Sequence, residues 1–150
     1  MIRLEETLPP LLIVTLEGKV TLDDVAVQRD AYQRRHDRSE AFGLMVDARN
    51  IELPNAEIRS ALANLSNDFG EATKRDCIGV TVVIESKLAV GALTAIKWFI
   101  KSPVDLTYHT SAALALTHLI ALGAPRGLHF PASCQSLVRS VDAAFKALKS

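Results

Sequence analysis

The stretch Cys77-Ile78-Gly79-Val80-Thr81-Val82-Val83-Ile84 gives the clearest indication of the fold. It is rich in β-branched residues and nearly continuous in its hydrophobicity, without the alternation of a half-exposed strand. Such a run is typical of a parallel strand that helices cover on both faces. We therefore expect residues 77–84 to form a central strand of an α/β domain.

Helices are expected on both sides of this strand in the sequence. Before it, Asn55 is placed to cap a helix. The apolar residues of that helix recur at spacings of four, three and four, namely Ile58, Leu62, Leu65 and Phe69. After the strand, Ser86 is placed to cap a helix over 87–101, which Pro103 ends.

Four further short strands complete the expected sheet, at Ile2 to Glu6, Leu11 to Leu16, Phe42 to Asp47 and Val104 to Tyr108. The first two should form an antiparallel hairpin through Pro9-Pro10, because proline is confined to turns and sheet edges. The sheet is therefore expected to be mostly parallel, with about five strands, an antiparallel N-terminal strand and right-handed crossovers.

Capping signals mark two more helices of the same unit. Thr21-Leu22-Asp23-Asp24 resembles a capping box at the start of a helix that runs to about Arg38. Thr110 or Ser111 is placed to cap another helix that ends at Gly123. The resulting order, β-β-α-β-α-β-α-β-α, contains four helices.

The chain after Gly123 is predicted to be an addition to this unit. A loop with Pro125, Gly127 and Pro131 precedes a helix with one apolar stripe, formed by Leu137, Val141, Ala144, Phe145 and Leu148. We expect residues 1–122 to form the α/β domain. Residues 123–150 should pack on that domain as a loop and an extra C-terminal amphipathic helix.

The composition excludes several classes of function. The 150 residues carry 17 Lys plus Arg and 17 Asp plus Glu, so nucleic acid is not an expected partner. Because the net charge is near zero, two copies of the chain repel each other little, and we expect that a homodimer can form. No segment reaches about 18 apolar residues and the start lacks a signal peptide, which predicts a cytoplasmic protein without a membrane span. Cys77 and Cys134 are expected to be free thiols.

Three strings carry a resemblance to a known family. They are Leu16-Glu17-Gly18-Lys19-Val20-Thr21, Gly43-Leu44-Met45-Val46-Asp47-Ala48-Arg49 and Ala112-Ala113-Leu114-Ala115-Leu116. With the element order, they resemble the STAS domain of anti-sigma-factor antagonists and sulphate-transporter tails, and more closely the SpoIIAA-like bacterial proteins. The resemblance covers about residues 1–122. It implies the STAS fold and a non-enzymatic binding role.

The chain departs from this family at the phosphorylated loop. In antagonists that switch by phosphorylation, the loop between the third strand and the second helix looks like Asp-Ser-Ser-Gly, and its serine accepts phosphate. Here the same stretch reads Leu53-Pro54-Asn55-Ala56, without a hydroxyl at the helix cap. Ser60 and Ser66 lie inside the helix, away from the terminal N–H groups that favour phosphate. A phosphoserine switch of that kind is not expected.

No combination of residues in the sequence predicts catalysis, a metal or a cofactor. The four histidines, His36, His109, His118 and His129, include no metal-binding spacing. Gly18-Lys19-Val20-Thr21 lacks the glycines of a phosphate-cradling loop, and His118 reads as a solvated imidazole. Cys77 begins a buried strand, where an inert core thiol is expected rather than a nucleophile. We predict that the protein is not an enzyme.

Two surfaces remain as candidate binding sites. Ligands of open parallel sheets bind beyond the carboxyl ends of the strands, where a candidate ligand rim consists of Arg49, Ser86, Lys87, His109 and Ser111. The second is a candidate interface on the flank of the helix over 87–101 that faces away from its apolar side, formed by Val90, Gly91, Thr94 and Trp98. Either the C-terminal helix or another subunit is expected to cover the only tryptophan.

These surfaces support two hypotheses of function from different classes. The first is a non-enzymatic STAS-like interaction or regulatory module that forms a homodimer or binds a regulatory protein. The second is a carrier or sensor that binds a small molecule or lipid in a pocket at the strand-end rim.

Overall fold

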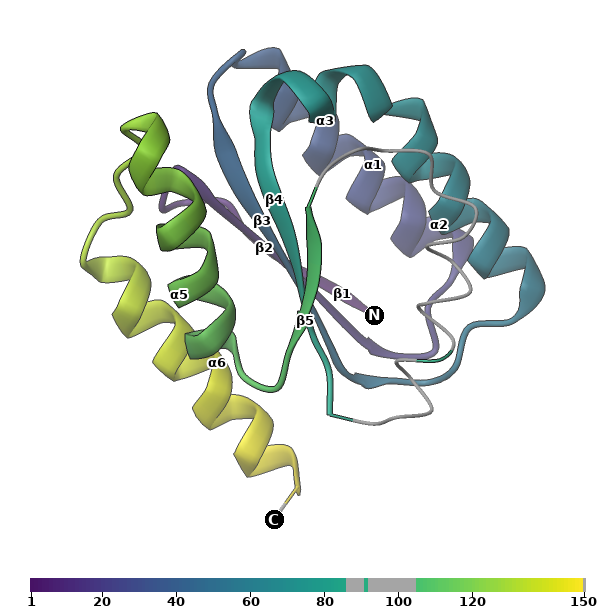
Figure 1. Cartoon of the computed structure of the whole chain (residues 1–150). Coiled ribbons are helices and arrows are strands. Elements are labelled where there is room, and N and C mark those ends of the chain that lie inside the picture. The colour runs from purple at the N-terminus through teal and green to yellow at the C-terminus, as the bar shows by residue number, and fades with distance from the viewer. Residues whose placement is uncertain (86–90, 92–104, 150) are drawn as a thin grey trace.

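A five-stranded sheet forms the centre of the part of the chain that the structure describes (Figure 1). The computed structural model describes residues 1–85, 91 and 105–149. The strands lie in the order β1-β2-β3-β4-β5 and are Ile2–Glu5, Leu11–Gly18, Phe42–Ile51, Cys77–Val83 and Leu106–His109. β1 pairs antiparallel with β2 and the other pairs are parallel. The prediction of five strands, parallel except for the first, is therefore confirmed.

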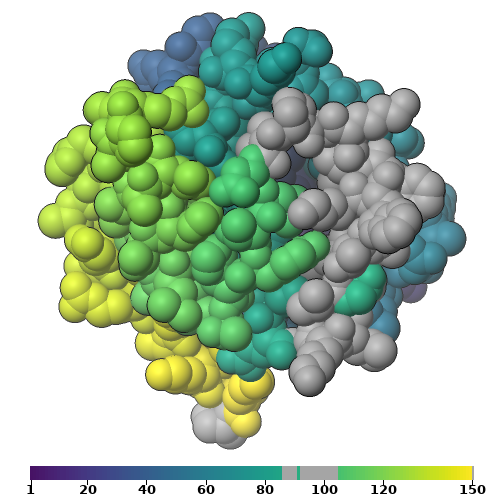
Figure 2. Space-filling view, viewed as in Figure 1, coloured from purple at the N-terminus to yellow at the C-terminus, as the bar shows by residue number. Residues whose placement is uncertain are grey.

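Helices cover both faces of this sheet (Figure 1). One face carries α1, α2 and α3, which are Leu22–Asp37, Ala56–Asp68 and Gly70–Asp76. The other carries α5 and α6, which are Ala112–Gly123 and Ser133–Lys149, joined through the 3-10 turn η1 at Ala124–Arg126. In the space-filling view α5 and α6 form one continuous surface (Figure 2). The helix expected over 87–101 lies outside the described residues, apart from Gly91.

The core consists of two layers because the side chains of a strand alternate between the faces of the sheet. From β2, Leu11 and Ile13 pack under α5 and α6, while Leu12 and Val14 pack under α1 and α2. The sheet also approaches α5 closely at Gly79, where a Cβ would lie 2.6 Å from Leu122 Cδ1. The nearly continuous hydrophobicity of the strands thus results from burial on both sides.

The helix starts follow the capping signals in the sequence. Thr21 and Asp24 form the reciprocal bonds of a capping box at the start of α1. Asn55 Oδ1 accepts a hydrogen bond from the Ile58 N–H at 2.9 Å, at the start of α2. These caps are local in sequence and were therefore predictable.

The structure corrects the expected elements in two places. α3, a seven-residue helix with the sequence GEATKRD, was not predicted, because it has no apolar periodicity and follows α2 directly. β2 and β3 are longer than expected, since Glu17 pairs with Asn50 and Gly18 with Ile51. Gly18, at φ +59°, is therefore the last paired residue of β2.

The C-terminal helix packs beside α5 on the sheet. Its buried residues are Cys134, Val138 and Phe145, so the buried face is rotated relative to the predicted stripe, and Ala144 and Leu148 are exposed. Cys134 and Val138 join the core layer that contains Leu11 and Ile13. No helix in the described part of the chain is long and apolar enough to cross a membrane. The division of the chain at residue 122 stays a prediction.

Candidate functional site

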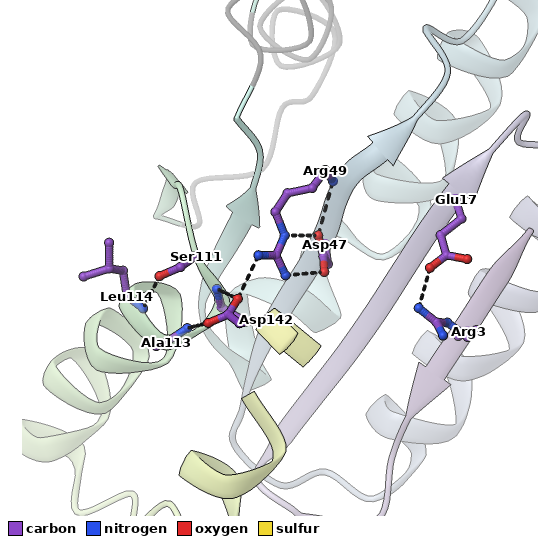
Figure 3. A network of polar contacts seen from close by, with 9 residues as sticks. Arg3, Glu17, Asp47, Arg49, Ser111, Ala113, Leu114 and Asp142 are labelled. Atoms are coloured by element: carbon purple, nitrogen blue, oxygen red, sulfur yellow. Dashed lines mark hydrogen bonds and ion pairs between the residues drawn. The ribbon is translucent and has the colours of Figure 1, made fainter. Parts of the chain in front are cut away.

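Arg49 lies at the carboxyl end of β3, where the ligand rim was predicted, and its guanidinium binds two carboxylates (Figure 3). Nε and Nη2 donate to the two oxygens of Asp47 at 2.9 and 2.8 Å. Asp47 and Arg49 are two residues apart on one strand, so their side chains leave the same face of the sheet. Nη1 donates to Asp142 Oδ1 at 2.8 Å, and the Arg49 side chain is only 3% exposed.

Asp142 belongs to α6, and its carboxylate occupies the N-terminus of α5 (Figure 3). Its Oδ1 accepts from the Ala112 N–H at 2.8 Å and its Oδ2 from the Ala113 N–H at 3.2 Å. Ser111 Oγ accepts from the Leu114 N–H at 3.1 Å. A helix N-terminus is a ready anion site, and here the chain fills it with its own side chains.

The electrostatics of this cluster favour the charged arginine. Burial alone lowers the pKa of Arg49, but the hydrogen bonds and charges of Asp47 and Asp142 outweigh burial and raise that pKa above its ordinary value. The Phe145 ring lies below the guanidinium, with its centroid 4.4 Å from Arg49 Cζ. Arg49 is thus held by a sheet residue and by two residues of α6.

A histidine pair lies at the carboxyl end of β5, which β4 separates from β3. His109 Nε2 lies 2.8 Å from Thr107 Oγ1, and its ring centroid lies 5.2 Å from that of His118. Burial, and then the charge of His118, lower the pKa of His109 against the opposing charge of Asp105. His118, predicted to be a solvated imidazole, lies 3.1 Å from Asp105 Oδ2 across 13 residues of sequence.

Among the described residues, the cavity beside Arg49 is small. A cavity of about 10 Å³ lies there, lined by Arg3, Thr15, Glu17, Asp47, Asn50, Val141, Phe145 and Leu148. That volume is close to the smallest that holds one water molecule. Arg3 also forms an ion pair with Glu17 across β1 and β2 (Figure 3). Ser86 and Lys87 lie outside the described residues, so the ligand rim as a whole stays a prediction.

The candidate interface falls almost entirely outside the described residues. Val90, Thr94 and Trp98 belong to the part of the chain whose structure is not described. Gly91 is exposed, and a Cβ built on it would have no heavy atom within 4 Å in the described part of the molecule. The expectation that α6 or another subunit covers Trp98 stays open.

A second polar cluster lies at the opposite end of the sheet. His36 Nδ1 lies 3.1 Å from Asp76 Oδ2, and Arg75 donates to both oxygens of Asp76 at 2.9 and 2.8 Å. The hydrogen bond from Arg75 lowers the pKa of Asp76 most; burial opposes this, and the hydrogen bond from His36 adds to it. The His36 ring stacks on Phe69 at 5.4 Å. Sequence patterns gave no sign of this pair, because 40 residues separate its members.

Cys77, which was expected to be an inert core thiol, lies beside this cluster. The thiol is buried and donates to the Gly79 carbonyl at 3.2 Å. Burial raises its pKa to about 11, so the thiol stays protonated at neutral pH. Among the described residues, no three side chains of His, Cys, Asp or Glu gather in an arrangement that could hold a metal ion.

The solved structures that are similar to this chain include the following two. One is an uncharacterized protein of the DUF3478 family with a SpoIIAA-like fold from Shewanella loihica PV-4, with a TM-score of 0.60 and 16% identity over 79% of this chain and 92% of that one. The other is an anti-sigma factor antagonist from Mycobacterium paratuberculosis, with a TM-score of 0.49 and 15% identity over the same shares. No protein-family model and no curated protein matches the chain.

Proposed function

From the SpoIIAA-like fold that the chain shares with the Shewanella loihica protein, we propose that it is a non-enzymatic interaction or regulatory module of the STAS type. In this proposal it forms a homodimer or binds a regulatory protein through Val90, Gly91, Thr94 and Trp98. The observation that carries the proposal is that Asp142 and Ser111 of the chain itself accept hydrogen bonds from the first N–H groups of α5, so that these groups are not free for a ligand.

A ligand site at the carboxyl ends of parallel strands normally leaves helix N–H groups and polar side chains free to receive the ligand. Here Arg49 is bound on three of its nitrogens, and the first N–H groups of α5 are capped by Asp142 and Ser111. The space beside Arg49 holds about 10 Å³. These contacts favour an interaction module over a carrier that binds a small molecule or lipid at this edge.

The connection from β3 to α2 supports regulation by binding alone. Asn55 occupies the cap position and gives its side-chain oxygen to the Ile58 N–H. Leu53, next to it, is 51% exposed, and Ser66 donates its hydroxyl to the Leu62 carbonyl inside α2. A phosphoserine switch at this loop is not part of the proposal.

Both thiols of the chain are free and buried, which supports a reducing compartment, and we propose the cytoplasm as its location. The raised pKa of Cys77 supports the non-enzymatic reading, because a protonated buried thiol is a poor nucleophile.

The experiment is the solution mass of the wild type and of Trp98→Ala, by light scattering after gel filtration. A dimeric wild type and a folded, monomeric Trp98→Ala variant are expected. Leu148→Ala is the matched control, since Leu148 is 59% exposed on α6 and its truncation should leave the dimer intact. A strictly monomeric wild type that also recovers no protein partner in a pull-down would contradict the proposal. A small molecule retained in native mass spectrometry would favour the carrier instead.

A further inference from the structure

A pocket of about 240 Å³ lies at the end of the sheet opposite to Arg49, where β2 begins and α1 ends. Leu11 and Leu12 at the start of β2 also line it; the side chain of Leu12 is buried on the α1 face of the sheet and that of Leu11 on the opposite face. The last turn of α1 and the residue after it contribute three arginines, and the segment before β2 contributes one acid. The polar lining is thus Glu6, Arg34, Arg35 and Arg38.

Arg35 is the unusual member of this lining. The residue is 6% exposed, and its Nε is buried without a hydrogen-bond partner. Within residues 1–85, 91 and 105–149, its guanidinium makes neither a hydrogen bond nor an ion pair. It lies over the Phe42 ring, whose centroid is 5.3 Å from Arg35 Cζ, and the more distant charges of Glu40 and Glu6 attract it. Burying a charge without a partner is costly, so the fold alone gives no reason for an arginine here.

The other charges make the pocket positive. Arg34 is paired with Glu6 through two hydrogen bonds, at 3.2 and 3.1 Å. Arg38 is exposed, and in the described part of the chain its side chain has no ion pair. Three guanidiniums and one carboxylate leave two positive charges in excess.

The helix dipole explains only part of this arrangement. Basic residues are favoured in the last turn of a helix, which accounts for Arg34 and Arg38 as solvated charges. It does not account for a third arginine that is turned into the protein without an acceptor. Burial, and then the charge of Arg38, lower the pKa of Arg35, while Glu40 and Glu6 oppose this shift. An anion in the pocket would relieve this unfavourable state.

We propose that this pocket binds a small dianionic oxyanion, best matched by a phosphate monoester, through Arg35 at its floor and Arg38 at its mouth. The Nη groups of the planar Arg35 guanidinium, which make no hydrogen bond in the described part of the chain, are the donors offered to two phosphate oxygens. Arg38 supplies a second cation, and Leu12 contacts the carbon part of the ligand. The site is independent of the proposed interface and lies at the other end of the sheet from Arg49.

The test measures binding of inorganic phosphate and of glycerol phosphate by calorimetry, with sodium chloride at equal ionic strength as the blank. Four proteins are compared: the wild type, Arg35→Met, Arg38→Gln and Arg139→Gln. Arg139 is the matched control, because it is exposed on α6, on the other face of the sheet. Arg38→Gln changes an exposed side chain, so it tests the site even if Arg35→Met alters the fold.

The wild type and Arg139→Gln are expected to bind with equal affinity. Arg38→Gln should weaken binding by about tenfold to hundredfold, the range for one charge-assisted hydrogen bond, and Arg35→Met should abolish it. Tighter binding of glycerol phosphate than of inorganic phosphate would show that the apolar lining contacts the carbon part of the ligand. Equal binding would show that the pocket recognises the free phosphate ion. The proposal is overturned if neither compound binds the wild type, or if all four proteins respond alike.

Discussion

Arg49 and Arg35 are both buried arginines, one at each end of the same sheet. Each guanidinium contacts an aromatic ring, Phe145 at 4.4 Å for Arg49 and Phe42 at 5.3 Å for Arg35. They differ in what else surrounds them. Arg49 donates to two carboxylates, whereas the guanidinium of Arg35 has no acceptor in the described part of the chain. The role of a buried charged side chain therefore depends on the groups that it contacts, and its burial alone does not reveal that role.

The contacts of Arg49 and Arg35 indicate different roles for the two ends of the sheet. At Arg49 the positive charge links β3 to α6 and, through Asp142, to the start of α5. At Arg35 the positive charge faces a pocket of about 240 Å³. We therefore expect substitutions at Arg49 to act on stability and substitutions at Arg35 to act on anion binding.

The largest effect is expected for Arg49→Met. It leaves the carboxylates of Asp47 and Asp142 without their cation, and removing one partner of a buried ion pair costs about 3–5 kcal/mol. Urea unfolding should show this loss in the free energy of unfolding. Arg139→Met, at an exposed position on α6, is the control and should change stability by less than about 0.5 kcal/mol. A loss below about 1 kcal/mol at Arg49 would contradict the structural role.

Asp142→Ala should have the next largest effect. It removes one partner of Arg49 and the acceptor for two N–H groups of α5, for an expected loss of about 2–4 kcal/mol. Asp142→Asn keeps a side-chain oxygen at the cap but removes the charge. Its free energy of unfolding should therefore lie between that of Asp142→Ala and that of the wild type. If Asp142→Asn equals the wild type in urea unfolding, the ion pair to Arg49 contributes nothing.

Asp76 tests whether a carboxylate near the Arg35 end acts like those around Arg49. Its hydrogen bonds from Arg75 and His36 should make Asp76→Asn less stable at pH 7 by about 1.5–3 kcal/mol. Because the pKa of Asp76 is lowered by folding, this advantage is present above its ordinary value of 3.8 and is lost as the pH falls through the lower, folded value.

The two proteins should therefore approach one another in stability when urea unfolding is repeated at decreasing pH below about 4. If the difference in the free energy of unfolding stays constant from pH 7 to pH 3, the charge of Asp76 does not contribute to stability.

The smallest effect is expected for Arg35→Met without added anion. Removing an unpaired buried charge and losing one ring contact should nearly cancel, which leaves stability equal to the wild type or higher, within about 1 kcal/mol. Urea unfolding in a phosphate-free buffer measures this directly. A loss as large as that of Arg49→Met would make Arg35 a structural residue and would remove the contrast between the two ends.

The parts of the fold that could be predicted depend on neighbours in sequence. Residues 77–84 indicated a buried parallel strand. Thr21, Asn55 and the pair Thr110 and Ser111, of which Ser111 is the cap, marked helix starts that the structure contains. The helix α3 was missed because its seven residues are polar and show no apolar periodicity. Local signals thus predicted the main elements, but not a short polar helix that follows another helix directly.

The candidate sites were less predictable, because their partners are distant in sequence. The position of Arg49 at the end of a strand was visible in the sequence, but its ion pair with Asp142 spans 93 residues. Arg35 reads in the sequence as one more basic residue in the last turn of a helix. Only the packing of α1 on the sheet shows that it is turned inward, against Phe42 and beside Leu11 and Leu12.

The same long connection affects how the protein is synthesised. A ribosome adds about 5–20 residues per second, so about 5–20 s pass between the synthesis of Arg49 and that of Asp142, which lies 93 residues later. During that interval β3 can pair with β2, but the start of α5 lacks its carboxylate cap. The strand ends therefore close only after Asp142 has been synthesised. A nascent chain that stalls before residue 142 would expose a buried cation and uncapped N–H groups to the quality-control machinery of the cell.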